Sequence, residues 1–252
     1  MTEAPATDLY GLRIENRADR MIVALHRPDV RNAIDAELVA SLHRVCADLE
    51  RRPRPMILTG GTEIFAAGAD IAQLRERTSE DALSGINSTI FDRIAALPMP
   101  TVAAVAGAAI GGGAELAYAC DFRIVTPTVR FANPEAQLGI MAAAGACWRL
   151  QELVGEPLAK EMLLAGRSID AGAALARGLA NEIVEPEDLL ATADRWVDRI
   201  LKAAPLAIRL TKAVLRSPRS AHPAIDNIAQ AVLFETAEKV IRMDRFLKRG
   251  QS

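Results

Sequence analysis

Apolar residues in the first half of the chain follow two spacings that alternate along the sequence. Over Leu9–Asn16 and Met21–Leu25 they alternate with polar residues or run together, a pattern typical of a β-hairpin. From Ile34 to Leu49 they recur every third or fourth residue, which predicts a helix over about residues 34–51. The same spacings predict, in order, a strand over 55–59, a small-residue loop over 64–71 that leads into a helix, a helix over 80–97, a buried strand over 101–106, a helix over 112–120, a strand over 121–126 and a turn over 131–135.

The second half of the chain, from about residue 143, follows mainly the helical spacing. Its clearest apolar stripe consists of Ile225, Ile228, Ala229, Val232 and Leu233. Such a stripe packs either on its own domain or on another subunit, and the pattern fits both. Strands alternating with helices, followed by helices alone, predict an α/β fold with a core over residues 1–200 and a C-terminal helical region over residues 201–252.

The composition fits one large α/β domain, with or without an appendage. Half of the 252 residues are hydrophobic and only 4% are aromatic, so small aliphatic side chains form the core. Such side chains suit closely packed helices and buried parallel strands better than a β-sandwich. The formal net charge of −2 gives no reason to expect a nucleic-acid partner. The ten Lys/Arg and four Asp/Glu between Lys202 and Ser252 fit either a solvated helical surface or a region that contacts phosphates.

Local features of the sequence indicate the cellular compartment and whether the chain crosses a membrane. Cys46, Cys120 and Cys147 form no C-x-x-C pair, and the stretch from Met1 to Asp8 has neither a basic start nor an apolar run. We therefore expect a cytoplasmic protein with reduced thiols. Thr101–Cys120 is long enough to span a bilayer, but its four glycines and its lack of aromatic belts favour a buried strand, a glycine turn and a buried helix. No membrane partner is expected.

The candidate chemistry lies in one glycine-rich stretch and one downstream turn. Gly111-Gly112-Gly113 can bring backbone N–H groups close to a ligand, and Glu115 follows at an apolar helix start. Glu135 is a second carboxylate that an apolar pocket could hold in a different protonation state. N–H donors plus a carboxylate pair suit the addition or removal of a proton next to a carbonyl. The same residues also fit a tight turn and two acids that complement helix dipoles.

Other kinds of site find no support in the sequence. Leu116 stands where the pattern G-x-G-x-x-G needs its last glycine, and no G-K-[ST], G-x-S-x-G or H-E-x-x-H occurs. The three histidines, His26, His43 and His222, are scattered along the chain. We therefore expect no metal site and no redox cofactor.

Several motifs occur together in a defined order. They are His26-Arg27-Pro28-x-x-x-Asn32-Ala33, Phe65-Ala66-Ala67-Gly68-Ala69-Asp70-Ile71, Gly111-Gly112-Gly113-Ala114-Glu115-Leu116-Ala117, Cys120-Asp121-Phe122-Arg123-Ile124, Phe131-x-x-Pro134-Glu135-x-x-Leu138-Gly139, and Gly166-Arg167-x-Ile169-x-Ala171 with Gly178-Leu179. In this order and spacing they resemble the motifs of the crotonase (enoyl-CoA hydratase/isomerase) superfamily, over about residues 9–250. The resemblance implies a crotonase-like spiral of β-β-α units, followed by a C-terminal helical region through which such proteins form homotrimers or dimers of trimers. It also implies an acyl thioester of coenzyme A as substrate, so that coenzyme A is part of the substrate and no separate cofactor is needed.

The resemblance assigns roles to individual residues. It implies Glu115 and Glu135 as the catalytic residues, and the backbone N–H groups of Ala69 and Gly112 as the oxyanion hole. It implies contacts with the coenzyme A or acyl part of the substrate at Ala66, Ala67, Gly68, Asp70, Ile71, Gly111, Pro134 and Ala143. Because both glutamates are present, the resemblance favours hydration of a trans-2-enoyl-CoA to a 3-hydroxyacyl-CoA in fatty-acid or related acyl-CoA breakdown. Glu115 is then expected to deprotonate water for attack at C3, and Glu135 to deliver a proton to C2.

Two alternatives stay open at this point. A Δ3,Δ2-enoyl-CoA isomerase would use Glu135 alone, and a catalytically weak acyl-CoA-binding homologue would show no turnover. The second alternative is raised by a departure from the family pattern Leu-Gly-x-x-Pro-Gly-x-Gly-Gly, in which Ala142, Ala143 and Ala146 replace the proline and two glycines. These added methyl groups leave the acyl-chain preference open within an expected short-to-medium range.

Overall fold

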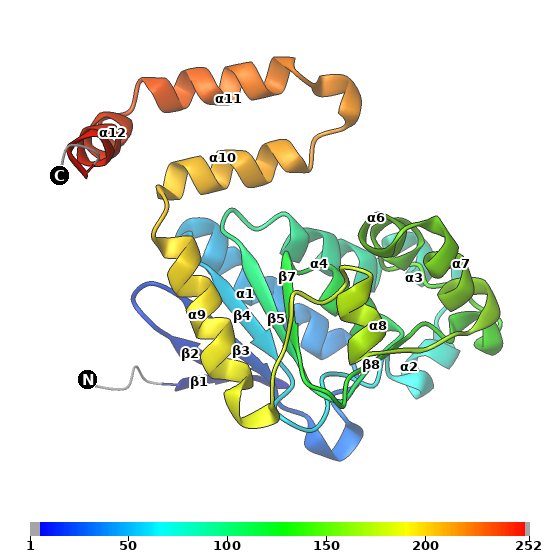
Figure 1. The fold of residues 1–252 in the computed structure, drawn as a ribbon. Helices are drawn as coiled ribbons and strands as arrows, with labels where there is room; N and C mark the ends of the chain where they lie inside the picture. Colours follow the sequence, from blue (N-terminus) through cyan, green and yellow to red (C-terminus); the bar gives the residue numbers. More distant parts are fainter. Residues whose placement is uncertain (1–5, 250–252) are drawn as a thin grey trace.

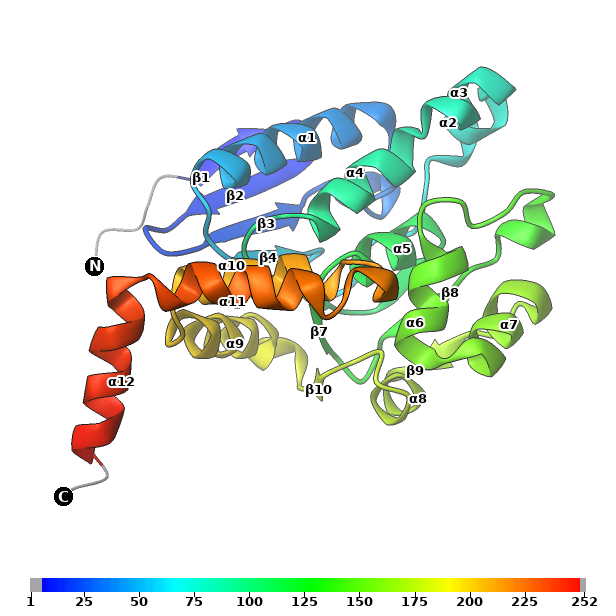
Figure 2. The ribbon, with the colours of Figure 1, turned by 90° about the horizontal axis from the view of Figure 1, so that it is seen from above.

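The computed structural model describes residues 6–249 and is built around a seven-stranded sheet (Figures 1 and 2). Its strands, in spatial order, are β1 (Ala6–Leu9), β2 (Leu12–Asn16), β3 (Met21–Leu25), β4 (Met56–Thr59), β5 (Thr101–Val105), β7 (Phe122–Val125) and β10 (Glu182–Ile183). The β1–β2 and β2–β3 pairs are antiparallel and the remaining pairs are parallel. The predicted hairpin and buried parallel strands are therefore confirmed. Residues 1–5, part of the stretch expected to carry no secretory signal, lie outside the described residues, as do residues 250–252 of the C-terminal region.

A second, three-stranded sheet was not predicted. It consists of β6 (Ala108–Ile110), β8 (Arg130–Ala132) and β9 (Ile169–Asp170), in the order β6-β8-β9. The chain passes from the first sheet to the second at Gly107, whose φ is +57°. A Cβ atom there would lie 1.9 Å from the carbonyl oxygen of Glu63, so only glycine fits this corner. Isolated bridges from Ala66 to Ala109 and from Ile34 to Ala69 join the loop before α2 to the same layer.

Helices cover both faces of the seven-stranded sheet. On one face α1 (Ala36–Arg51) packs against α4 (Ile86–Ala95), and on the other α9 (Leu189–Leu201) lies on β5 and β7 (Figure 1). The side chains of successive strand residues point to opposite faces of the sheet. Met56 and Leu58 belong to the core under α1, whereas Ile57 belongs to the core under α9.

The prediction of one continuous helix over residues 80–97 is wrong. The structure has two helices there, α3 (Ser79–Ser84) and α4. Gly85 between them has a φ of +66°, and Thr78 and Asp81 form a capping box that starts α3 independently. The remaining helices are α2 (Ile71–Glu76), α5 (Gly112–Tyr118), α6 (Gln151–Val154), α7 (Glu156–Ala165), α8 (Ala171–Ala176), α10 (Pro205–Leu215), α11 (Ala224–Phe234) and α12 (Ala237–Arg249). The short helical turns are η1 (Pro28–Val30), η2 (Glu135–Leu138), η3 (Ala146–Leu150), η4 (Pro186–Asp188) and η5 (Arg219–Ala221).

None of the helices within residues 6–249 combines the length and the apolar character that crossing a bilayer requires. The long apolar run Thr101–Cys120 is divided among β5, β6 and α5, in agreement with the expected strand, glycine turn and buried helix.

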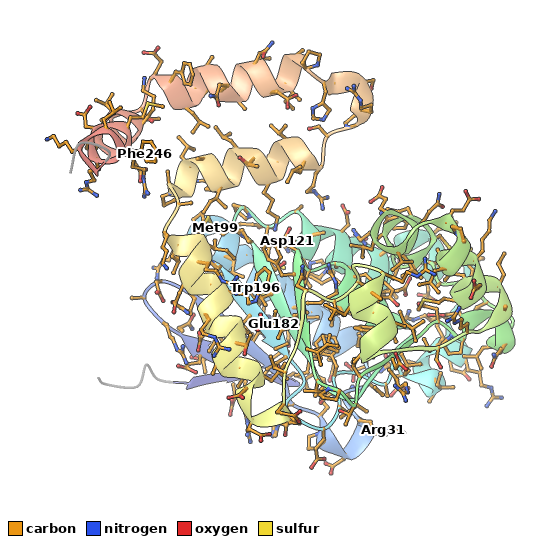
Figure 3. All side chains as sticks on the ribbon, in the orientation of Figure 1. Arg31, Met99, Asp121, Glu182, Trp196 and Phe246 are labelled. Atoms are coloured by element: carbon orange, nitrogen blue, oxygen red, sulfur yellow. The ribbon has the colours of Figure 1, made fainter. Side chains whose placement is uncertain are left out.

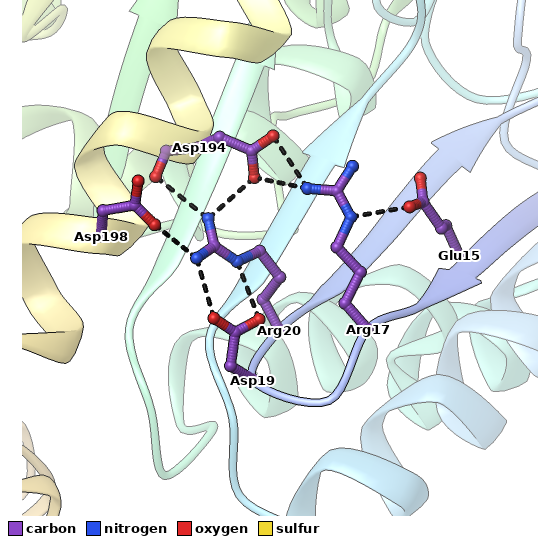
Figure 4. A network of polar contacts seen from close by, with 6 residues as sticks. All are labelled: Glu15, Arg17, Asp19, Arg20, Asp194 and Asp198. Carbon is purple, nitrogen blue, oxygen red and sulfur yellow. Dashed lines mark hydrogen bonds and ion pairs between the residues drawn. The ribbon is translucent and has the colours of Figure 1, made fainter. Parts of the chain in front are cut away.

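A polar network fixes α9 to the turn between β2 and β3 (Figure 4). Its members are Glu15, Arg17, Asp19, Arg20, Asp194 and Asp198. The guanidinium of buried Arg20 binds Asp19, Asp194 and Asp198, and these carboxylates raise its pKa. Because removing one partner of a buried cation leaves a costly unpaired charge, this cluster firmly connects the first hairpin to the helix that closes the opposite face.

The C-terminal helices extend away from the sheet and meet it through α10 (Figures 1 and 2). Buried Lys212 on α10 donates to Asp121 Oδ2 at 2.6 Å and to the carbonyl oxygen of Met99 at 3.1 Å (Figure 3). By contrast, Ile228 of the predicted stripe on α11 is 66% exposed, and Phe246 on α12 is 79% exposed. Large apolar side chains of α11 and α12 therefore remain uncovered within a single chain.

Candidate active site

A cavity of about 470 Å³ lies between α5, the loop before α2, the α3–α4 segment and the stretch after β8. Five of the predicted site residues line it: Ala69, Gly112, Glu115, Glu135 and Ala143. The other lining residues, which the sequence did not single out, are Leu74, Arg77, Thr78, Asp81, Ala82, Gly85, Ile86, Asn87, Ser88, Ile140, Met141 and Ala144. The structure thus brings both glutamates and both predicted amide donors to one cavity.

Glu115 is held on the short, fully buried helix α5. Its side chain is only 3% exposed, and its Oε1 accepts hydrogen bonds from the backbone N–H groups of Ala144 at 2.8 Å and Ala146 at 3.1 Å. Burial raises the pKa of Glu115 to about 7, and the nearby charge of Glu135 adds to this rise. The carboxyl group can therefore exchange a proton near neutral pH.

The turn that supplies these two N–H donors depends on Gly145 and Arg149. Gly145 has a φ of +135°, and a Cβ atom there would lie 2.2 Å from Arg149 Nη1. Arg149 is buried, binds Asp92 Oδ1 at 2.8 Å and stacks on Trp148 with 4.9 Å between the guanidinium carbon and the ring centroid. This stacked and paired cation fixes the position of the turn and hence of both donors.

The alanines that depart from the family pattern leave this arrangement intact. The side chains of Ala142 and Ala146 point into the protein core, while the N–H groups of residues 144 and 146 face Glu115. Ala143 lines the cavity itself. Ala143 therefore lies at the cavity, whereas the methyl groups of Ala142 and Ala146 lie in the core.

Glu135 begins the short helix η2, directly after Pro134. Its side chain is 9% exposed, and its Oε2 is buried without a hydrogen-bond partner among residues 6–249. Burial raises the pKa of Glu135, while its own backbone N–H and the neighbouring amide of Asn133 oppose the rise. Gly111 approaches this carboxylate closely, since a Cβ atom on Gly111 would lie 3.0 Å from Glu135 Oε1.

Two of the residues that line the cavity, Ala69 and Gly112, lie next to each other. A Cβ atom on Gly112 would lie 3.6 Å from the nitrogen of Ala69, so the two residues adjoin. Neither N–H donates to another group within residues 6–249. Gly113 serves a different purpose, because a Cβ atom there would lie 2.3 Å from the carbonyl oxygen of Ala66. Close packing of α5 against the loop at Ala66 therefore brings the Gly112 and Ala69 amides side by side.

Seven predicted substrate contacts lie outside the residues that line the cavity: Ala66, Ala67, Gly68, Asp70, Ile71, Gly111 and Pro134. Ala66 is fully buried and its backbone pairs with β6, so it shapes the floor from behind. The carboxylate of Asp70 accepts the N–H of Gln73 at 3.0 Å and caps α2. Ile71 is exposed at the start of that helix. Their contacts with coenzyme A stay predictions.

Comparison with known proteins finds relatives over most of the chain. The model of the enoyl-CoA hydratase/isomerase family matches residues 16–249. The short-chain-enoyl-CoA hydratase of Clostridium acetobutylicum is 37% identical over 210 residues, covering 81% of this chain and 80% of that protein. The crotonyl-CoA hydratase of Syntrophomonas wolfei is 33% identical over 95% of both chains. The crystal structure of an enoyl-CoA hydratase from Bacillus anthracis superposes with a TM-score of 0.88 at 26% identity, covering 95% of this chain and 96% of the other.

Proposed function

We propose that this chain, which belongs to the enoyl-CoA hydratase/isomerase family, adds water to a trans-2-enoyl-CoA and forms a 3-hydroxyacyl-CoA. The observation that carries the proposal is the meeting of Glu115, Glu135 and the two free amides of Ala69 and Gly112 at one cavity. Relatives that are named for enoyl-CoA or crotonyl-CoA hydration support it. The reaction is redox-neutral and needs only proton transfers and charge stabilisation, so we expect no metal or redox cofactor.

The amides of Ala69 and Gly112 would bind the thioester oxygen. As water attacks C3, electron density moves from the C2–C3 double bond onto this oxygen, and the two N–H donors stabilise the developing negative charge. Each such donor contributes about 2.7–4 kcal/mol of transition-state stabilisation in well-characterised oxyanion holes. Backbone donors suit the task because the fold fixes their position before the substrate binds.

The two glutamates would carry the protons. Oε1 of Glu115 is occupied by two N–H donors, which leaves Oε2 to accept a proton from water as the water oxygen bonds to C3. Glu135 would give its proton to C2, and exchange with solvent would then restore the starting state. The sum is one water added, with no change in the number of protons on the pair. Because its two members interact, the pair titrates as a unit, and the active form is the singly protonated tautomer in which Glu135 carries the proton and Glu115 is ionised.

The apolar part of the cavity supports a range of lengths for the acyl chain of the substrate. Leu74, Ile86, Ile140 and Met141 line it together with the methyl group of Ala143. This lining and the volume of about 470 Å³ support a short-to-medium acyl chain. Arg77, at the same cavity, is a basic residue that suits a phosphate group of coenzyme A.

The proposal includes a homotrimer or a dimer of trimers. It is supported by the exposed apolar side chains of α11 and α12, including Ile228 and Phe246, since exposed apolar patches mark association surfaces. Analytical ultracentrifugation would test it, and a monomer at micromolar concentration would contradict it. A cytoplasmic location also stays a prediction.

The hydration assay mixes purified protein with crotonyl-CoA and follows the loss of ultraviolet absorbance of the conjugated thioester. We expect Glu115→Gln and Glu135→Gln each to lower kcat by about 10²–10⁴-fold, because each removes one acid/base group. Gln at position 115 keeps an oxygen for the Ala144 and Ala146 donors, so circular dichroism should show an unchanged fold.

Other outcomes would replace the proposal. Turnover of a 3-enoyl-CoA that survives in Glu115→Gln would identify an isomerase that uses Glu135 alone. Acyl-CoA binding by calorimetry without turnover of any enoyl chain from four to twelve carbons would identify a binding homologue.

A further inference from the structure

Two polar residues behind Glu135 have no assigned role. Asn133 lies at the end of β8 and is 2% exposed, and Tyr118 at the end of α5 is buried as well. The Tyr118 hydroxyl donates to Asn133 Oδ1 at 3.1 Å, and its ring packs against Phe131 with centroids 6.0 Å apart. The hydrogen bond occupies the oxygen of the Asn133 amide and thereby leaves its Nδ2 group facing away from the tyrosine.

Two buried atoms here lack a hydrogen-bond partner, and one is a donor while the other is an acceptor. Nδ2 of Asn133 is a donor without an acceptor, and Oε2 of Glu135 is an acceptor without a donor, within residues 6–249. Buried polar atoms are nearly always hydrogen-bonded, and an unpaired one costs about 1–3 kcal/mol. The two residues are separated in sequence by Pro134 alone, and the Asn133 amide lowers the pKa of Glu135 together with the backbone N–H of Glu135 itself.

No other neighbouring titratable group is available to donate to Oε2 among the described residues. The groups that face Glu135 are Glu115 and Tyr118 on α5 and Cys147 on η3. The Tyr118 hydroxyl is committed to Asn133, and the Cys147 thiol donates to the carbonyl oxygen of Ala142 at 3.3 Å. Oε1 of Glu115 accepts two backbone N–H groups, and the proposed mechanism needs this carboxylate ionised, without a proton to donate.

We propose that Asn133, oriented by Tyr118, is a positioning residue that donates its Nδ2–H to Glu135 Oε2 and directs the other carboxylate oxygen toward C2 of the bound thioester. The inference rests on the proposed hydration for its catalytic consequence, but the Tyr118–Asn133–Glu135 arrangement is a property of the protein alone. A donor to a carboxylate stabilises its ionised form, so Asn133 offsets part of the effect of burial on Glu135. Removing it can only raise the pH values at which the Glu115–Glu135 pair titrates.

The first experiment needs no substrate. In protein labelled with ¹³C at the glutamate side-chain carboxyl carbon, the Glu135 resonance is assigned by its loss in Glu135→Gln and titrated by NMR. We expect its midpoint to move to higher pH in Asn133→Leu, further in the isosteric Asn133→Asp, and less in Tyr118→Phe. Tyr10→Phe is the matched control, because it removes a tyrosine hydroxyl hydrogen bond to Asp35 at 2.8 Å outside the cavity. An unchanged midpoint in both Asn133 variants would overturn the proposal even if the enzyme is an active hydratase.

The second experiment measures kcat and KM for crotonyl-CoA across pH. We expect the acidic limb of kcat/KM to move to higher pH in Asn133→Leu, with about a tenfold loss on that side, and kcat to fall more than KM rises. A merely structural role would lower activity equally at all pH values, and that result would also overturn the proposal. A moved NMR midpoint without hydration of any enoyl-CoA would instead contradict the proposed function and leave the arrangement standing.

Discussion

The two glutamates occupy the same cavity but are held in different ways. Glu115 receives two backbone N–H groups from the turn at residues 144–146, and a paired, stacked arginine fixes that turn from behind. Within residues 6–249, Glu135 receives no hydrogen bond on its buried Oε2, and its pKa is lowered by its own backbone N–H and by the side-chain amide of Asn133. One carboxylate is therefore positioned by the fold of the main chain and the other by the identity of particular side chains.

The two glutamates should therefore respond differently to single substitutions around them. Replacing a side chain, except by proline, leaves a backbone donor in place, so the hydrogen bonds to Glu115 are sensitive mainly to changes that move the turn. The surroundings of Glu135 can change through single substitutions at Asn133 or Tyr118 without moving the main chain. We expect the pH dependence of the reaction to be adjusted on the Glu135 side.

The largest effect should come from breaking the turn that holds Glu115. In Gly145→Ala the new Cβ would lie 2.2 Å from Arg149 Nη1 at a residue with a φ of +135°, so we expect either the Arg149 guanidinium or the turn with both donors to shift. Because a displacement of about 1 Å near the chemistry costs about 10²-fold, we expect kcat for crotonyl-CoA to fall by at least that factor.

Gly139→Ala is the matched control at the end of η2. Gly139 also has a positive φ, +76°, but a Cβ there meets nothing within 4 Å. We expect only about 1–2 kcal/mol of backbone strain and nearly normal kcat. Equal loss of kcat in the two variants would mean that strain, not displacement of the Glu115 donors, lowers activity.

The next effect concerns stability and pH. The pKa of Glu115 is raised from its ordinary 4.5 to about 7, so folding favours the protonated form. Relative to Glu115→Gln, wild type should lose roughly 3 kcal/mol of unfolding free energy as the pH rises from 4.5 to 8. Urea denaturation at both pH values measures this difference.

The same measurement on Glu135→Gln sharpens the comparison. Burial raises the pKa of Glu135 but the Asn133 amide opposes the rise, so the change should have the same sign and a smaller size. A larger pH dependence for Glu135→Gln than for Glu115→Gln would reverse the contrast between the two sites.

The smallest effect is expected at Ala146, where this chain departs from the glycine usual in the family. Its methyl group is buried, so Ala146→Gly should cost about 1 kcal/mol of unfolding free energy. Its N–H still donates to Glu115, and kcat should change by less than twofold. A large gain in kcat would instead show that the added methyl groups weaken the hydratase.

Much of the first sheet and both glutamates could be predicted from the sequence, because their signals are local. Alternating and helical spacings mark the strands and long helices, and Glu115 is conspicuous on an apolar helix after three glycines. The strands β6 and β8 escaped prediction because each has three residues, too few for an alternation to repeat. Gly85 was also missed as a helix boundary, since a lone glycine inside a helical pattern does not show whether its φ is positive.

The surroundings of the glutamates could not be predicted for a different reason. Every residue except proline has a backbone N–H group, so the residue types at positions 144 and 146 do not identify them as partners of Glu115. The motif around Glu135 leaves the position of Asn133 unspecified, and the contact of Asn133 with Tyr118 joins α5 to the residue after β8. Both arrangements arise from tertiary packing, which brings together segments that no sequence spacing relates.

Trp148 stacks on Arg149, so its fluorescence should respond to movements of the turn at residues 144–146 that holds Glu115. The chain contains two tryptophans, and the other, Trp196, lies on α9, where its indole N–H binds Glu182. Replacing Trp196 by phenylalanine would leave Trp148 as the single tryptophan, partly exposed and adjacent to the residues that hold the Glu115 carboxylate. Its fluorescence would then follow the arrival of an acyl thioester in real time, and the protein would report on its own active site without an attached dye.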